Sequence, residues 1–260
     1  MGGEIRTERS GPSVTLTISQ PARRNALTVA MWQDLAAHVL DLAGDDELRC
    51  IVIRGGTAEA FSAGADISEF HTSRSTHEQV VRFHEEYVGG CLSAIAECPV
   101  PIVAAIQGAC FGGGLEIAVA CDLRIASRDA RFGAPVGRIG FPLALGETEG
   151  LFRLVGPSVT AELLIEGRLF DAPTACAKGL VSRVVEVADF EGAIAETVGN
   201  ICASGIQAAR SHKRQIQRLM RDAAPVTYAE RMEVYSFAES QEYKHGVQAF
   251  LTKALTRNGK

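Results

Sequence analysis

The sequence predicts an α/β protein with a helical C-terminal part. Short runs of β-branched and aliphatic residues alternate with amphipathic stretches up to about residue 187, and only helical spacing follows from Phe190. A chain of 260 residues with 47% hydrophobic content is long enough to bury one sizeable core. We therefore expect an α/β core domain over residues 1–190 and a helical region over residues 191–260.

The first expected elements are two strands separated by a charged turn and a helix. Residues 14–18 alternate and are rich in β-branched side chains, and residues 50–54 form a second apolar run that two glycines close. Between them, Thr28 suits the N-cap of a helix that ends near Leu42. The turn at residues 20–25 carries two positive charges and precedes this helix.

Small residues at positions 60–67 bring backbone close to a surface. Asp66 in this stretch suits either a cap of the following turn or a ligand-binding role. A long helix is expected next, over residues 76–98, and prolines stop it. His77 and His84 lie on this helix, where a lone histidine is usually structural or solvated.

A glycine-rich turn between a strand and a helix is the most distinctive stretch. Residues 102–106 resemble a buried strand, and the glycines at 108 and 112–114 allow sharp turns and close approach of another molecule. The helix that starts near Leu115 offers unpaired N–H groups to an anion, or to an oxygen that becomes anionic during a reaction. Glu116 lies about one turn beyond Gly113, where its carboxylate either faces that ligand or only balances the helix dipole.

The second half starts with a strand and a long loop and then becomes helical. Residues 131–146 show little periodic pattern and are expected to form a loop. The other expected elements are strands at 123–126 and 181–187 and helices at 151–154, 160–165, 194–203, 206–221 and 227–239. Basic residues on the helix at 206–221 are expected to make a solvated face rather than recruit an anionic partner: Arg210, Lys213, Arg214, Arg218 and Arg221.

Composition argues against several classes of partner and site. A net charge of −5 without a basic block makes a nucleic-acid partner unexpected. The seven cysteines are scattered and form no C-x-x-C pair, which indicates reduced thiols in a cytoplasmic protein and neither disulfides nor a metal site. The first residues lack the apolar region of a signal peptide, and no run reaches membrane-spanning length.

Several motifs fall in one order along residues 14–253. They are PARRNAL at 21–27, FSAGADI at 61–67, the glycine-rich helix start at 108–116 followed by Cys121-Asp122, FGAP at 132–135 with Gly140, and a later block at Gly167-Arg168, Ala175 and 179–181. Each motif alone is weak. Their joint order and spacing resemble the crotonase superfamily, the enoyl-CoA hydratase/isomerase family.

The resemblance implies a fold, an assembly and a substrate class. The fold is a crotonase-like spiral of β-β-α units whose C-terminal helices form a trimerisation region. Trimers of this family often pair, so we expect a homotrimer or homohexamer. The substrate is an acyl-CoA, and no cofactor is expected beyond the coenzyme A that the substrate carries.

The resemblance also assigns roles to individual positions. The backbone amides of Ala65 and Gly113 match the pair that binds the thioester oxygen and stabilises an enolate, and Glu116 matches the glutamate that activates water. Candidate coenzyme A contacts are Arg24, Ala26, Ala63, Asp66, Ile67 and Lys253. Arg24 and Lys253 would meet the phosphates, although ordinary surface charge explains both equally well.

The chain departs from the family pattern at its second acid. Family hydratases carry a glutamate after the proline of the F-G-x-P block to protonate the α-carbon, and the residue here is Val136. Glu147 occupies a position that is glycine in the family. It is either a relocated acid or a solvated carboxylate that caps the next helix, and Glu149 is a second candidate helper.

Three functional hypotheses follow. The first is hydration of a 2-enoyl-CoA in fatty acid or related acyl-CoA degradation, with Glu116 as general base and acid, helped by Glu147 or Glu149. The second is another enolate reaction, such as isomerisation, decarboxylation or thioester hydrolysis, because Val136 cannot transfer a proton. The third is a protein that binds acyl-CoA, or assembles with partners, without turnover.

Overall fold

Two sheets form the body of the protein in this computed structural model, which describes residues 2–258 and, within them, leaves out the side chains of residues 250, 251 and 253–258. The larger sheet has the order β1 (Glu4–Ser10), β2 (Ser13–Ser19), β3 (Cys50–Gly55), β5 (Ile102–Ile106), β7 (Leu123–Ser127) and β10 (Arg183–Val185). The smaller sheet has the order β4 (Ala60–Ser62), β6 (Ala109–Phe111), β8 (Arg131–Gly133) and β9 (Phe170–Asp171).

The strands alternate between the two sheets along the chain. Each of β3, β5 and β7 in the larger sheet is followed by β4, β6 or β8 in the smaller one, and helices follow each pair. Within each sheet these strands pair in parallel, whereas β1 pairs antiparallel with β2, and β9 with β8. This repeat is the β-β-α spiral that the sequence resemblance implies, and the predicted α/β class is confirmed.

The helices cover the sheets and then continue alone to the C-terminus. Their bounds are α1 (Val29–Ala43), α2 (Phe70–Ser73), α3 (His77–Arg82), α4 (Gly89–Glu97), α5 (Gly113–Ala120), α6 (Leu145–Leu164), α7 (Ala172–Ala177), α8 (Phe190–Ala203), α9 (Ile206–Arg221), α10 (Tyr228–Val234) and α11 (Gln241–Asn258). The predicted cap of α1 is confirmed, because the Thr28 side chain accepts a hydrogen bond from the Met31 amide.

The helix expected at residues 76–98 is present but contains a wider turn. It begins at α3 with a capping box of Thr76 and Gln79, passes through a π-helical turn at Phe83–Val88, and continues as α4. A π-helical turn inside an α-helix often marks a functional site. Here it carries His84.

The central strands of the larger sheet are buried on both faces. Ile51 and Ile53 of β3 point into the main core with Trp32 and Leu35 of α1. The alternate positions Cys50 and Val52 belong to a second cluster with Phe190 and Ile194 of α8. Helix α8 therefore covers the outer face of the sheet, as the double burial of parallel strands requires. The proposed domain boundary at residue 190 stays a prediction.

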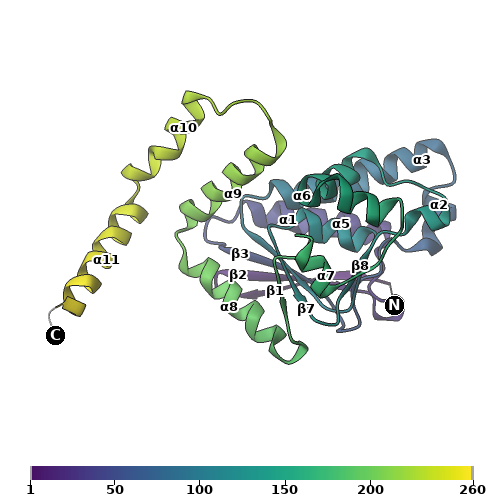
Figure 1. The fold of residues 1–260 in the computed structure, drawn as a ribbon, viewed down its shortest axis with the longest axis horizontal. Coiled ribbons are helices and arrows are strands. Elements are labelled where there is room, and N and C mark those ends of the chain that lie inside the picture. The colour runs from purple at the N-terminus through teal and green to yellow at the C-terminus, as the bar shows by residue number, and fades with distance from the viewer. Residues whose placement is uncertain (1, 259–260) are drawn as a thin grey trace.

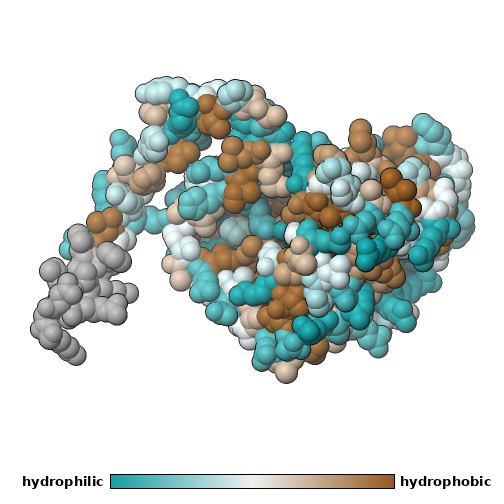
Figure 2. All heavy atoms as spheres, in the orientation of Figure 1, coloured by the Kyte–Doolittle hydropathy of each residue, from teal (hydrophilic) through white to brown (hydrophobic). Residues whose placement is uncertain are grey.

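The last two helices extend away from the body. Helix α9 runs along the body, and α10 and α11 then form an arm that leads away from it at the left of the view (Figure 1). Apolar residues appear along this arm and beneath α9 in the space-filling view (Figure 2). Large side chains on the arm are exposed, among them Tyr228, Met232, Tyr235, Phe237 and Tyr243. No helix in the described part of the chain is both long and apolar enough to cross a membrane.

The solvated basic face expected on α9 is wrong for two of its residues. Arg210 and Lys213 are buried. Lys213 Nζ lies 2.7 Å from Asp122 Oδ2 and donates to the Val100 carbonyl at 3.1 Å, and an Arg210 Nη donates to the Asp45 carbonyl at 2.7 Å. These contacts fasten α9 to the body of the protein.

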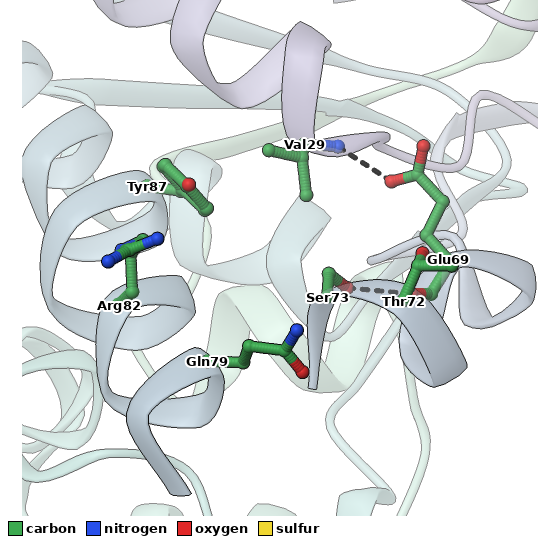
Figure 3. Close-up of a pocket in the computed structure, with 7 residues that line it drawn as sticks. All are labelled: Val29, Glu69, Thr72, Ser73, Gln79, Arg82 and Tyr87. Carbon is green, nitrogen blue, oxygen red and sulfur yellow. Dashed lines mark hydrogen bonds between the residues drawn. The ribbon is translucent and has the colours of Figure 1, made fainter. Parts of the chain in front are cut away.

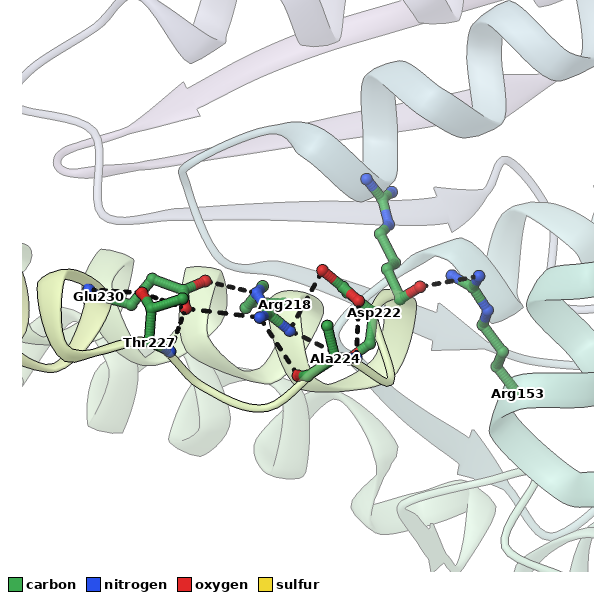
Figure 4. Close-up of polar contacts among 7 residues, drawn as sticks. Arg153, Arg218, Asp222, Ala224, Thr227 and Glu230 are labelled. Atoms are coloured by element: carbon green, nitrogen blue, oxygen red, sulfur yellow. Dashed lines mark hydrogen bonds and ion pairs between the residues drawn. The ribbon is translucent and has the colours of Figure 1, made fainter.

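The basic residues further along α9 are also paired with carboxylates. Arg218 Nε lies 2.5 Å from Glu230 Oε1, which ties α9 to α10 (Figure 4). A hydrogen bond from the Thr227 backbone, with those from Arg218 and the Thr227 hydroxyl, lowers the pKa of Glu230 to about 2. Arg221 pairs with Glu97 of α4 at 3.1 Å. Helical spacing indicated where these side chains lie on α9 but not what covers them.

We expect Lys213→Ala to lower the free energy of unfolding by about 2–3 kcal/mol, because the substitution leaves Asp122 without its partner. This loss is smaller than for a fully buried ion pair, since the Asp122 side chain is 27% exposed. Urea unfolding at fixed protein concentration measures this. Arg214→Ala, at the exposed neighbouring position, is the control and should change stability by less than about 0.5 kcal/mol. Equal effects of the two substitutions would contradict the ion-pair assignment.

Candidate active site

The two small-residue turns predicted from the sequence meet in the structure. Gly64 follows β4 with φ 97°, and Gly112 precedes α5 with φ 48°, both in the region that favours glycine. A Cβ at Gly64 would lie 3.4 Å from the Gly113 nitrogen, and a Cβ at Gly113 would lie 3.7 Å from the Ala65 nitrogen. The amides of Ala65 and Gly113 are therefore close neighbours.

These amides are available to a ligand. Gly113 is the first residue of α5, where N–H groups have no partner within the helix and the helix dipole is positive. Among the described residues, neither the Ala65 nor the Gly113 amide has a hydrogen-bond acceptor. Two converging donors of this kind can hold one oxygen atom and stabilise negative charge on it.

Packing explains why small residues surround this pair. A Cβ at Gly113 would lie 2.6 Å from the Trp32 ring, and a Cβ at Gly114 would lie 2.7 Å from the Ser62 carbonyl oxygen. Trp32 is itself buried in the core. Helix α5 can approach β4 and α1 this closely only because these positions carry no side chain.

Glu116 lies on the first turn of α5 and is buried. Burial raises the pKa of its carboxyl well above its usual value, and the nearby charge of Glu147 raises it further. The positive charge of Arg74 acts in the opposite direction. Glu116 therefore holds its proton to higher pH than an ordinary glutamate, which suits a general acid–base.

Glu147 is buried, although the sequence allowed a solvated position. Its Oε2 accepts a hydrogen bond from the Ala144 amide at 3.0 Å, so its role as a helix cap is confirmed. Its Oε1 lies 2.7 Å from His84 Nδ1, and only 2% of the side chain is exposed. Glu149 instead points to the surface and pairs with Arg153 at 2.6 Å. Glu147, and not Glu149, is the carboxylate that acts on Glu116.

Sequence reasoning missed two residues of this cluster, His84 and Arg74. His84 was expected to be structural or solvated, yet its ring reaches Glu147 and lies between Phe83, at 5.3 Å, and Phe141, at 6.3 Å. Burial lowers the pKa of Arg74 to about 10, although the charges of Glu147 and Glu116 raise it. Glu147 lies far from both His84 and Arg74 in the sequence. No motif or periodic pattern therefore connects these residues.

Val136 begins a short 3-10 turn, Val136–Ile139, and is half-buried. Its side chain has no proton to give. The carboxyl groups found in the cluster are those of Glu116 and Glu147, which come from α5 and from the first turn of α6. The second carboxyl of the cluster therefore comes from a different element than position 136.

All the predicted coenzyme A contacts except Lys253 come together along one edge of the site. The Ala63 amide donates to the Arg24 carbonyl at 3.0 Å, and Leu27 pairs with Ala65 in a parallel bridge. Arg24 and Ala63 are exposed, Ile67 is 60% exposed, and Ala26 is buried.

Asp66 holds this edge together. It caps the Ser68 amide at 3.0 Å and pairs with Arg23 at 2.6 Å, so the capping role is confirmed. Burial raises the pKa of its carboxyl, but the hydrogen bonds from Ser68 and the charge of Arg23 outweigh this and hold the pKa below its usual value. The Lys253 side chain lies outside the described residues.

A separate pocket of about 260 Å³ lies between the start of α1 and helices α2 and α3 (Figure 3). It is lined by Val29, Glu69, Thr72, Ser73, Gln79, Arg82 and Tyr87. None of the carboxylates and amides described above lines it, so we do not assign the chemistry to this pocket. No group of three metal-ligating side chains gathers among the described residues.

Comparison with known proteins agrees with this geometry. The family model described as enoyl-CoA hydratase/isomerase matches residues 9–257. The short-chain-enoyl-CoA hydratase of Clostridium acetobutylicum is 30% identical over 95% of this chain and 94% of its own length. A probable enoyl-CoA hydratase of Mycobacterium bovis is 31% identical over 96% of this chain and 95% of its own length.

Solved structures show the same fold. A crystal structure described as an enoyl-CoA hydratase/carnithine racemase from Magnetospirillum magneticum superposes with a TM-score of 0.93 at 38% identity, covering 96% of this chain and 92% of that one. The enoyl-CoA hydratase of Bacillus anthracis superposes with a TM-score of 0.90 at 27% identity, covering 96% of both chains.

The raised pKa of Glu116 predicts a pH-dependent stability. The unfolded chain ionises near the usual value of 4.5, whereas the folded protein keeps this proton to higher pH. Stability from this group is therefore complete below that value and is lost as pH rises towards the folded pKa. We expect Glu116→Gln to gain stability relative to the unaltered protein by up to about 1.4 kcal/mol per pH unit as the pH rises above the unfolded value, until the folded pKa is reached.

Urea unfolding of both proteins over this pH range provides the measurement. Glu149→Gln is the matched control, because it removes an exposed carboxyl and should show no such trend. Parallel pH profiles for Glu116→Gln and the unaltered protein would contradict the assignment.

Proposed function

Because the chain belongs to the enoyl-CoA hydratase/isomerase family, we propose that it adds water across the double bond of a 2-enoyl-CoA. The observation that carries this proposal is the position of two unpartnered amides, of Ala65 and Gly113, at the start of the helix that bears the buried Glu116. An oxygen held by these amides places the acyl group against helix α5.

The amides supply electrostatic stabilisation. When water adds to the β-carbon, negative charge moves through the conjugated system onto the thioester oxygen. Ala65 and Gly113 donate to this enolate oxygen, and each donor of this kind is worth about 3–4 kcal/mol in enzymes. No side chain is needed for this step, in keeping with the small residues around the site.

Hydration also needs one group that takes a proton from water and one that delivers a proton to the α-carbon. Glu116 is the general base and acid of this proposal, and Glu147 completes the pair. Glu147 Oε1 lies 2.7 Å from His84 Nδ1, so His84 positions the Glu147 carboxyl.

Coenzyme A is proposed to bind along the edge formed by residues 24–27 and 63–67. Arg24 would meet a phosphate, and the exposed Ile67 beside Ala63 offers an apolar surface to the adenine and pantetheine groups. Ala26 and Asp66 would stabilise this edge from the protein interior, since both are buried. No cofactor beyond the substrate's own coenzyme A is proposed.

We also propose that the protein assembles as a homotrimer or homohexamer. The arm of α10 and α11 carries exposed aromatic residues and lies apart from the active site (Figure 1). Lys253 belongs to α11 on this arm. Because the arm lies apart from the active site of its own chain, Lys253 would contact coenzyme A bound to a neighbouring copy. A cytoplasmic location is supported by the seven cysteines, which are all free thiols.

Val136 favours a second candidate, another enolate reaction on the same platform. Loss of the acid at position 136 changes where the α-carbon can be protonated, which would suit isomerisation, decarboxylation or thioester hydrolysis. Absorbance of the conjugated thioester, with a thiol reagent in parallel, separates hydration from isomerisation and hydrolysis. Binding of acyl-CoA without change in any channel would favour a non-catalytic protein.

Glu116→Gln should lower the hydration rate by about a hundred- to ten-thousand-fold while acyl-CoA binding is kept, because the amide cannot transfer the proton. Glu147→Gln should also lower the rate, whereas Glu149→Gln should not, since Glu149 lies at the surface. The measurement is loss of 2-enoyl-CoA absorbance under saturating substrate. Unchanged turnover in the Glu116 variant would overturn the mechanism.

Val136→Glu restores the acid of the family pattern at that position. If Glu147 already supplies this function, we expect at most a few-fold rise in the hydration rate. In the double variant Val136→Glu with Glu147→Gln, the loss of Glu147 should then lower the rate less than it does in the unaltered protein. A rise of a hundredfold or more, judged by the same absorbance assay, would mean that the native protein lacks a second acid and that its own reaction differs.

A further inference from the structure

We propose that Arg74 binds a carboxylate at the distal end of the acyl group, so that the substrate is the coenzyme A thioester of a dicarboxylic acid. This inference rests on the proposed function, because it takes the acyl group to lie against Glu116. It adds the chemical class of the acyl chain, which the hydration chemistry alone leaves open.

Arg74 is partly buried but lacks the polar partners that the buried arginines Arg124 and Arg210 have. Its Nε is buried and has no hydrogen-bond acceptor among the described residues, and no described carboxylate lies within ion-pair distance of its guanidinium. Arg210 also has an unpartnered Nε, but its Nη2 donates to the carbonyls of Asp45 and Leu48. A buried donor without a partner is costly, so its retention at Arg74 points to a ligand that supplies the acceptor.

Three aromatic rings from different segments hold the Arg74 guanidinium. Its Cζ lies 3.6 Å from the ring centre of Phe83, 4.0 Å from that of Phe70 and 5.4 Å from that of Phe141. Stacking on ring faces fixes a guanidinium plane while leaving its N–H edge free to donate. The same planar edge matches a carboxylate, to which arginine donates two parallel hydrogen bonds.

The Arg74 guanidinium lies within the electrostatic range of the proposed chemistry. The charges of Glu147 and Glu116 both act on it, although neither forms an ion pair with it among the described contacts. Phe141 links it to the catalytic cluster, because its ring contacts both Arg74 and His84, the partner of Glu147. A short acyl chain held at the amides of Ala65 and Gly113 would therefore point a terminal group towards this cation.

The position of Arg74 also disfavours a simple alkyl chain. An acyl group that ends in methyl would cover the guanidinium without supplying an acceptor and leave its donors unpaired. Sites built to hydrogen-bond a polar group reject analogues that lack it far more strongly than apolar pockets reject a change of size. Arg74 would thus select for the charged chain end.

Binding of saturated acyl-CoA analogues tests this without any turnover. We would compare five- to seven-carbon acyl-CoA thioesters that end in a carboxylate with the same thioesters that end in a primary amide, using titration calorimetry. In the unaltered protein the best carboxylate should bind about ten- to a hundredfold more tightly than its amide. Arg74→Gln should abolish this ratio while leaving the affinity of the amide nearly unchanged.

Two further variants separate recognition from general electrostatics. Arg74→Lys keeps the charge but loses the planar fork, so the ratio should fall only in part. Arg128→Gln removes an exposed arginine that pairs with Glu186 and should leave the ratio intact. If Arg74→Gln weakens carboxylate and amide equally, Arg74 only balances the charge of the glutamates and the proposal is overturned.

Failure of the proposed function would look different. If no acyl-CoA of either series binds, both the proposed function and this inference fall. If both series bind equally well to the unaltered protein, only the carboxylate preference is refuted, and the hydration proposal stands on its own assay.

Discussion

The close approach of two backbone turns is the constraint on which the rest of this structure depends. Gly64 and Gly113 lie so near each other that a Cβ at Gly64 would be 3.4 Å from the Gly113 amide. The β-β-α spiral makes this possible, because β4 and β6 pair in parallel and end beside one another. The positions of the candidate site residues follow from this contact between the two turns. The amides converge there, Glu116 follows one turn later on α5, and the edge proposed to bind coenzyme A continues from Ala65 back to Arg24.

Burial of charge is the second constraint. Helix α5 packs against α4, α6 and the strands β4 and β6, and Glu116 is buried, which favours its protonated form. The surrounding groups supply positive charge and hydrogen bonds to the two buried glutamates. Arg74 brings a positive charge, while His84 and the Ala144 amide satisfy Glu147. The cluster draws on four elements of the chain, so neither carboxylate can be understood from its own helix alone.

Local pattern predicted the long elements well and the short ones poorly. The helix capped by Thr28 and the buried strands were visible because their apolar periodicity is strong. Strand β1 was missed since all but one of its residues are exposed, and β4, β6 and β8 are only three residues long. The ion pair of Lys213 with Asp122 and the contact of His84 with Glu147 join segments 91 and 63 residues apart. Neither periodicity nor motif spacing reports such contacts, whereas the amide pair was found because family motifs mark both of its turns.

The charge of the cluster connects the proposed reaction to the proposed substrate. Burial and the charge of Glu147 raise the pKa of Glu116, so this carboxyl holds its proton more readily than an ordinary glutamate. The proposed hydration needs a group that can both take up and deliver a proton. The charges of both glutamates act on Arg74 without an ion pair to either among the described contacts, which leaves its donors open. A ligand carboxylate that contacts the guanidinium directly gains more from it than the distant glutamates do, because the interaction strengthens as separation falls. The same cation can therefore tune the acid–base pair in the free protein and recognise the chain end in the complex.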